Sequence, residues 1–295
     1  MTARFLERAL RRALGDPHLS VLNTSAIDGG CINHAVRLET TQGEFFAKWN
    51  AEGPGDLFVC EAAGLEALAG AGSSVVIPRV IVAEGPRDGD PAFLILEYLA
   101  PSGFRGGEND EQLGRGLAAI HRHTAATFGF PGVSYCGSTR QDNRACASWV
   151  EFYRERRLRP LLAALGATGV LSVADQGLYE RLFTRLPDLL SASSPPALIH
   201  GDLWSGNVMN TARGPALVDP ACAFAAREMD FGISTLFGGF SERAFAAYEE
   251  ASPLPAGWLE RNPLYQLYHL LNHAVLFGGR YADDARRIAS RFVGG

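Results

Sequence analysis

The stretch ALIHGDLWSGNVMN, residues 197–210, places an acid at Asp202 and an amide at Asn207, directly behind a short apolar run. A second apolar run, residues 216–218, ends in another acid, Asp219. Short apolar runs of this kind are typical of buried strands. We therefore expect two strands that pair across a short loop and present two carboxylates and one carboxamide at their ends.

Two acids and an amide in this arrangement are typical of a magnesium–phosphate site. Mg²⁺ prefers oxygen ligands and keeps several waters, so Asn207 and Asp219 suffice as protein ligands when substrate phosphates complete the shell. In phosphoryl transfer a carboxylate kept off the metal positions the attacking hydroxyl and accepts its proton. We expect Asp202 to be this catalytic base.

The N-terminal part of the chain supplies residues that would hold a nucleotide. Lys48 lies on a predicted strand at residues 45–49, and Glu61 lies near the start of a predicted helix at residues 57–68. A strand lysine paired with a helix glutamate orients the α- and β-phosphates in kinases. The sequence therefore predicts an ATP site in which Lys48 pairs with Glu61.

Two further segments complete the predicted ATP site. The turn at residues 25–33 lies one strand before Lys48, and its backbone N–H groups are expected to cover the phosphates. The segment LEYL, residues 96–99, is expected to be the hinge that meets the adenine edge through its backbone. The residues that we assign to these two segments are Gly29, Gly30, Cys31, Asn33, Glu97, Tyr98 and Leu99.

The triplet Asp230-Phe231-Gly232 spells the D-F-G motif that carries the metal-binding acid of protein kinases. It follows no apolar strand and opens a helical pattern, where an acid is explained by capping and by the helix dipole. We therefore reject Asp230 as a metal ligand and keep Asp219.

The pattern of elements divides the chain into two lobes. The first, residues 1–99, begins with an amphipathic helix and has strands at 21–27, 35–40, 45–49, 78–82 and 92–96 around the helix at 57–68. The second lobe, residues 100–295, follows a segment rich in glycine and proline and is mostly helical, with helices at 110–125, 147–166, 174–190, 241–251, 263–277 and 283–292. We predict an α+β, bilobal, protein-kinase-like fold with a small five-stranded antiparallel sheet.

Composition excludes several classes of function. With 27 Lys+Arg against 32 Asp+Glu, the net charge of −5 gives no reason to expect a nucleic acid or a membrane as partner. The five cysteines contain no C-x-x-C pair, which disfavours a disulfide framework and a structural zinc site. No apolar run approaches the roughly 20 residues that span a bilayer. We expect a cytoplasmic protein, either a monomer or a homodimer.

With these residues identified, the chain resembles the fructosamine kinase (ketosamine-3-kinase) family of protein-kinase-like small-molecule kinases. The resemblance rests on HGDLWSGN at 200–207 and on blocks spread over nearly the whole chain, among them GGCIN at 29–33, FFAKWN at 45–50, EAAGLEAL at 61–68, FLILEYL at 93–99, REMDFG at 227–232 and YHLLNHAVLFGGRYA at 268–282. It implies ATP-dependent phosphorylation of the 3-hydroxyl of a ribulosamine or fructosamine, free or on a protein lysine. Such phosphorylation makes the adduct labile, which implies a role in deglycation.

The resemblance also implies Asp202 as base, Mg²⁺ on Asn207 and Asp219, and phosphates oriented by Lys48 with Glu61. Two departures from the family pattern put substrate-side details in doubt. Residues 224–226 read FAA where the family tends to have Tyr-Gly-His, and Arg140 stands where proline is usual.

Residues on the substrate side follow less directly from the sequence. Trp204 is a candidate for stacking on the sugar or on the carrier lysine, and His273 is a candidate for the wall of the substrate site. His269 and His273 recur at i, i+4 without the glutamate of H-E-x-x-H, so packing is favoured over a metal site. Cys31 is a candidate for oxidation, because backbone N–H groups around it would favour the thiolate.

Two other functions stay open at this point. A related kinase that acts on an aminoglycoside, choline or another alcohol would use the same machinery. A non-catalytic nucleotide-binding module would keep the fold but would be free to lose its catalytic groups. The sequence retains all the expected ones, namely Lys48, Glu61, Asp202, Asn207 and Asp219.

Overall fold

The computed structural model describes residues 2–27, 33–102, 106–190 and 195–294. Three predicted phosphate-binding residues, Gly29, Gly30 and Cys31, lie outside this described part, as does the hypothesis of Cys31 oxidation. Among the described residues, no helix combines the length and the apolar character needed to cross a membrane.

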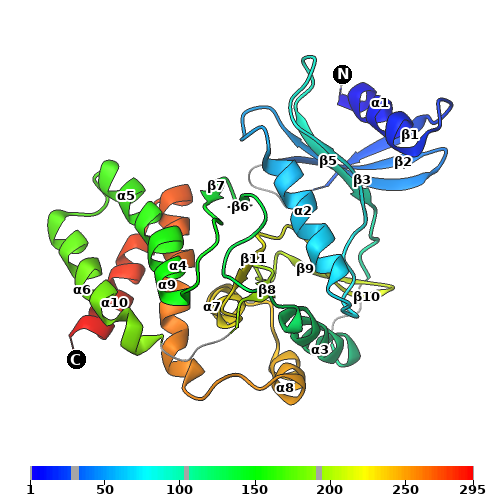
Figure 1. Ribbon diagram of the computed structural model, residues 1–295. Helices are drawn as coiled ribbons and strands as arrows, with labels where there is room; N and C mark the ends of the chain where they lie inside the picture. The colour runs from blue at the N-terminus through cyan, green and yellow to red at the C-terminus, as the bar shows by residue number, and fades with distance from the viewer. Residues whose placement is uncertain (1, 28–32, 103–105, 191–194, 295) are drawn as a thin grey trace.

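The small lobe is a five-stranded antiparallel sheet with a helix on each face (Figure 1). The strand order is β1 (Val21–Ala26), β2 (His34–Thr40), β3 (Gly43–Asn50), β5 (Ala92–Glu97) and β4 (Val80–Glu84). Successive residues of a strand face opposite sides of the sheet. Phe93 and Ile95 of β5 accordingly pack in the cluster with α1 (Thr2–Leu14), whereas Leu94 and Leu96 pack in the cluster with α2 (Leu57–Gly70). The predicted sheet and its main helix are confirmed.

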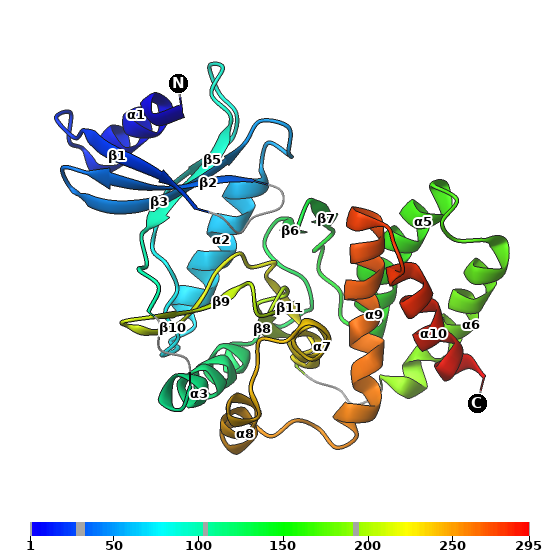
Figure 2. The same ribbon diagram turned by 180° about the vertical axis from the view of Figure 1, so that it is seen from behind.

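The remainder of the chain is mostly helical and lies below and to one side of the sheet in both views (Figures 1 and 2). The helices are α3 (Glu108–Arg122), α4 (Trp149–Phe152), α5 (Arg159–Ala167), α6 (Val173–Leu189), α7 (Glu228–Phe237), α8 (Glu242–Ala251), α9 (Trp258–Phe277) and α10 (Tyr281–Val293). The short strands are β6 (Ser134–Cys136), β7 (Thr139–Gln141), β8 (Ala197–Ile199), β9 (Val208–Thr211), β10 (Gly214–Leu217) and β11 (Ala223–Ala225). Aromatic side chains from α4, the following turn and α9 fill the core, with Trp149 stacked on Tyr153 and on Tyr265.

The long helix predicted at 147–166 is interrupted by a π-helical turn, η1 (Tyr153–Leu158), between α4 and α5. Pro160 explains the interruption, because it has no N–H to donate to the carbonyl four residues earlier. That carbonyl, of Arg156, accepts instead from the guanidinium of the buried Arg157 at 3.2 Å. Helix α9 also differs from its prediction, since it begins at Trp258 and contains Pro263 rather than starting there.

The expectation that the strand before Asp202 pairs with the strand before Asp219 is wrong. β8 pairs with β11, and β10 pairs with β9, which is the strand that follows Asn207. The loop that carries Asp202 and the loop that carries Asp219 are joined by two backbone hydrogen bonds. Val218 N donates to Asn207 O at 3.1 Å, and Ala221 N donates to His200 O at 2.8 Å. β9 and β10 are adjacent in the sequence and pair with each other as a hairpin. The predicted longer-range pairing with β8 therefore does not form.

Candidate active site

The loop that carries Asp202 has a backbone that only glycine accommodates at its second position. Gly201 has φ +82°, and a Cβ atom there would lie 2.1 Å from the carbonyl oxygen of Ala221. His200 is fully buried; its Nε2 donates to Val218 O at 3.0 Å, and its Nδ1 accepts from Asp202 N at 3.3 Å. Burial lowers the pKa of His200, so this residue braces the loop as a neutral imidazole.

Asn207 is oriented by hydrogen bonds to both acids. Its Nδ2 donates to Asp202 O at 2.8 Å and to Asp202 Oδ2 at 3.1 Å, with a longer contact of 3.5 Å to Asp219 O. Because all three partners are acceptors, the amide nitrogen must face them, and the amide oxygen is left for another ligand. Asp219 has φ +54°, a left-handed conformation that aspartate tolerates better than most residues, and its side chain is 53% exposed in the cleft. An amide oxygen and an exposed carboxylate are a donor set that fits Mg²⁺.

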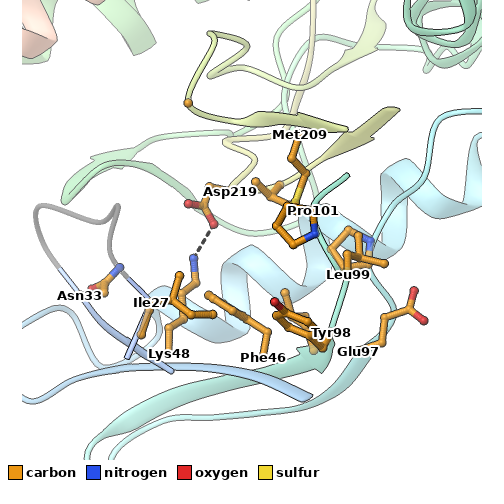
Figure 3. Close-up of a pocket in the computed structure, with 15 residues that line it drawn as sticks. Ile27, Asn33, Phe46, Lys48, Glu97, Tyr98, Leu99, Pro101, Met209 and Asp219 are labelled. Carbon is orange, nitrogen blue, oxygen red and sulfur yellow. Dashed lines mark hydrogen bonds and ion pairs between the residues drawn. The ribbon is translucent and has the colours of Figure 1, made fainter. Parts of the chain in front are cut away.

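Lys48 joins the two lobes. Its Nζ lies 2.7 Å from Glu61 Oε2 and 2.7 Å from Asp219 Oδ1, and its side chain is only 6% exposed (Figure 3). Burial alone would lower the pKa of Lys48, but the two carboxylates outweigh it and raise that pKa. The sequence predicted the contact with Glu61 and missed the contact with Asp219, which depends on how the lobes meet.

The acids of the site are shifted in opposite directions. Burial raises the pKa of Asp202 to about 7, opposed by the Asn207 hydrogen bond and assisted by the charge of Asp219. Burial likewise raises the pKa of Glu61 to about 7, although Lys48 acts against it. For Asp219 the attraction of Lys48 exceeds the effect of desolvation in the cleft, so its pKa is lowered. An acid with a pKa near 7 next to an acid with a lowered pKa is the pattern of a proton acceptor next to a cation ligand.

Asp230 has a role that the sequence analysis missed. Its carboxylate accepts from His200 N at 2.8 Å and from Gly201 N at 2.7 Å, and it meets His121 Nε2 at 3.1 Å. Asp230 is fully buried inside the first turn of α7, whose N-cap residue is Arg227, so the explanation by capping is wrong. The rejection of Asp230 as a metal ligand agrees with this position beneath the loop. No local pattern identifies the brace, because its partners lie 29 and 30 residues earlier.

A cavity of about 360 Å³ between the lobes contains the predicted hinge (Figure 3). Its lining includes Asn33, Lys48, Glu97, Tyr98, Leu99 and Asp219, together with Ile27, Phe46, Pro101 and Met209, which the sequence analysis did not single out. Within the hinge, Glu97 N donates to Arg79 O at 2.9 Å and Tyr98 N to Glu44 O at 3.4 Å. The Glu97 carboxylate is engaged by Arg213 at 3.1 Å. The apolar residues give this cavity walls of the kind that hold an aromatic base.

A second cavity, of about 510 Å³, adjoins the first, and Lys48, Asp219, Asn33 and Gly206 line both. Asp202, Trp204 and His273 all line this second cavity, together with Tyr135, Cys136, Phe237, Asn272, Phe277 and Tyr281, which the sequence analysis did not assign. Trp204 covers Gly206, where a Cβ atom would lie 2.4 Å from the indole ring. His273 stands among Phe237, Tyr281 and Phe277, with ring centroids 4.6, 5.2 and 5.5 Å away, and its Nδ1 donates to His269 O at 2.8 Å.

The two departures from the family pattern are not in the lining of the cavities, although Arg140 lies opposite Tyr135, which lines the second cavity. Phe224 and Ala225 are in β11, paired with β8, and Ala226 is buried next to them. Arg140 is exposed on β7. Within the described part of the chain, none of these four residues belongs to the lining of either cavity.

Comparisons with known proteins agree with this geometry. The family model described as fructosamine kinase matches residues 4–294. The chloroplastic protein-ribulosamine 3-kinase of Arabidopsis thaliana is 36% identical over 281 residues, which cover 92% of this chain and 83% of that protein. The crystal structure of a candidate fructosamine-3-kinase from Thermobifida fusca has a TM-score of 0.85 at 33% identity and covers 97% of this chain and 98% of its own.

A solved aminoglycoside phosphotransferase shares the fold alone, with a TM-score of 0.63 at 16% identity over 99% of this chain and 98% of its own. These likenesses confirm the predicted α+β, protein-kinase-like fold. Since the family model and the relatives both extend over nearly the whole chain, this protein belongs to the fructosamine kinase family.

Proposed function

We propose that this protein is an ATP-dependent ketosamine kinase that phosphorylates the 3-hydroxyl of a ribulosamine or fructosamine, free or on a protein lysine. The observation that carries the proposal is the meeting of two cavities at Lys48 and Asp219, with Asp202 on the wall of the second. A phosphoryl group can pass only where donor and acceptor sites touch. The names of the family and of its relatives supply the class of acceptor.

The first cavity is the proposed ATP site. The N–H groups of Glu97 and Tyr98 are already used within the lobe, so we expect the adenine edge to be bound by the next amide, that of Leu99. Phe46 and Met209 would enclose the ring, and Lys48 would contact the phosphates. The phosphate contacts expected from Gly29, Gly30 and Cys31 remain predictions.

Mg²⁺ would be held by the amide oxygen of Asn207 and the carboxylate of Asp219, where it would neutralise charge on the phosphates. The carboxylate of Asp202 instead accepts a hydrogen bond from the amide nitrogen of Asn207, so we do not count it as a metal ligand. It is therefore left to accept the proton of the 3-hydroxyl as that oxygen forms its bond to the γ-phosphorus. The bond from the γ-phosphorus to the bridging oxygen breaks, and ADP keeps the electron pair.

The second cavity is the proposed ketosamine site. Trp204 offers a flat face next to the base, and His273 presents an imidazole held at Nδ1 by His269 O. Trp204 and Phe277 line this cavity and are both exposed, so a carrier amine, either small or part of a protein, would extend from this side. The phosphorylated adduct is labile, so the proposed role is deglycation, which we place in the cytoplasm.

A panel of ATP-consumption assays tests the proposal. We expect turnover with a ribulosamine or a fructosamine, and little with an aminoglycoside or choline. The Asp202→Asn variant is the control, because it keeps both cavities and loses the proposed base. Turnover on an aminoglycoside or choline, with none on either ketosamine, would assign the protein to the alternative class of acceptor.

A further inference from the structure

Behind the proposed base lies a cluster of three side chains with different donor atoms. Cys136 ends β6, Asp202 is in the loop after β8, and His269 is in α9. The thiol sulfur, one carboxylate oxygen and one imidazole nitrogen all lie within 4.8 Å of one another. Cys136 is 3% exposed and His269 is fully buried, so the cluster faces the protein interior on one side and the second cavity on the other.

His269 is the unusual member of the cluster. Among the described residues, neither ring nitrogen has a partner at the distance and angle of a regular hydrogen bond, although the backbone of Met229 lies close enough to interact with the ring. Asn272, one turn later, is 1% exposed; its Nδ2 donates to Cys136 Sγ at 3.2 Å, and its Oδ1 is buried without a partner among the described residues. Buried polar atoms are rarely left unpaired, and a ligand is one physical reason for them.

We propose that Cys136, Asp202 and His269 form an inhibitory site for a thiophilic divalent cation, with Zn²⁺ the best fit. Sulfur, imidazole nitrogen and carboxylate oxygen are the ligands of Zn²⁺, and three of them with one open position make a tetrahedral site. Bonds of about 2.0–2.3 Å place tetrahedral ligand atoms roughly 3.5 Å apart. Cys136 Sγ and Asp202 Oδ1 are already 3.7 Å apart, so the closure of about 1 Å falls on the most distant pair of the cluster. On binding, Cys136 releases its thiol proton to solvent and coordinates as the thiolate.

Mg²⁺ and Zn²⁺ would bind at different sites because they prefer different ligand atoms. Mg²⁺ requires oxygen atoms and is suited to Asn207 and Asp219, whereas the sulfur and nitrogen atoms of the cluster select a softer ion. Occupancy by Zn²⁺ would take the carboxylate of Asp202 away from proton transfer. The inhibitory effect therefore rests on the proposed function, while the binding of the ion rests on the cluster alone.

No pattern in the sequence indicated this site. The cysteines show no metal-binding spacing, which disfavoured a structural zinc site, and the spacing of His269 and His273 favoured packing. The three ligands come from segments separated by 66 residues and by 67 residues, from 136 to 202 and from 202 to 269, so no local spacing connects them.

Cobalt binding to the full-length protein tests the site directly. We expect one equivalent of Co²⁺ to give a thiolate-to-cobalt charge-transfer band in the wild type. The band should be lost in His269→Leu and in Cys136→Ser, and retained in His123→Leu, a matched change at an exposed histidine. His269→Leu removes unpaired polar atoms at similar volume, so we expect it to fold, which thermal unfolding will verify. No band in the wild type, or an undiminished band in both cluster variants, would overturn the site.

Zinc inhibition tests the consequence. With a ketosamine and excess MgATP, we expect Zn²⁺ to inhibit the wild type and a chelator to restore activity. In His269→Leu, which keeps Asp202, the inhibitory concentration should rise about 100-fold, since even supporting residues of metal sites contribute 10- to 100-fold in affinity. Equal inhibition of both proteins would refute the inhibitory role. If neither ketosamine is phosphorylated without zinc, the proposed function fails, and the cobalt measurement still decides the site.

Discussion

Two aspartates at the two cavities of the cleft have pKa values shifted in opposite directions although they lie only 17 positions apart, from Asp202 to Asp219. Asp219 is 2.7 Å from the ammonium of Lys48, and its pKa is lowered. Asp202 has no cation at hydrogen-bond distance among the described residues, and burial raises its pKa to about 7. The difference teaches that the surroundings, not the residue type, separate a metal ligand from a base.

The walls of the two cavities differ in the same way. The nucleotide side is built from strands and the hinge, with apolar faces such as Phe46 and Met209. The acceptor side is built from the loop after β8 and from helices α7 and α9, with Trp204, Phe237 and His273 around the base. If the two sides work separately, a change on one side should affect one substrate and spare the other.

The largest effect is expected from Asp202→Asn. Loss of a positioned base lowers turnover by about 10²- to 10⁴-fold. The KM for ATP should stay within a few-fold of wild type, because Asp202 lines only the second cavity. Steady-state kinetics with a ketosamine and ATP measures both values. An equally large loss of ATP affinity would break the separation between the two sides.

The pH dependence of activity is the next test. Because the pKa of Asp202 is raised to about 7, the base is protonated and inactive below that pH, and kcat/KM for the ketosamine should fall by about tenfold per pH unit there. Between pH 8 and pH 5 the fall should reach about 100-fold. The pKa of Glu61 is also raised to about 7, so Glu61→Gln is the control. If the fall of kcat/KM at low pH remains in this variant, Asp202 causes it. If the fall disappears, Glu61 causes it.

A pair of alanine variants compares the walls. Phe46→Ala should raise the KM for ATP about tenfold and leave the KM for the ketosamine unchanged, since truncating one aromatic contact costs about 1–2 kcal/mol. Trp204→Ala should do the reverse. Each variant serves as the control for the other. If both raise the same KM, one of the two cavities is wrongly assigned.

The last prediction concerns stability rather than kinetics. The pKa of Asp202 rises from 3.8 to about 7 on folding, so the folded state holds an extra proton between these values, and its stability falls as pH increases through them. Asp202→Asn removes this penalty, which is about 2–4 kcal/mol above pH 7. The variant should therefore unfold several degrees higher than wild type at pH 8 and close to it at pH 4. Equal Tm values at both pH values would contradict the raised pKa.

Much of the fold followed from local patterns. Short apolar segments separated by turn residues predicted the strands of the sheet, and three- to four-residue spacing predicted most of the helices. The prediction failed where competing elements were close in sequence, as in the hairpin of β9 and β10. It also missed the π-helical turn, which depends on Pro160 and the buried Arg157 together.

The residues of the site can also be divided into those that local sequence patterns predicted and those that they did not. The sequence by itself determined the donor groups of the catalytic loop and its partners, because Lys48, Glu61, Asp202, Asn207 and Asp219 occur in an order whose chemistry is recognisable without coordinates. Only the tertiary structure decided that Lys48 reaches Asp219, that Asp230 braces the loop, and that Cys136 and His269 lie behind the base. These contacts join residues far apart in the chain, and burial, charge and hydrogen bonding between such residues exist only once the chain has folded.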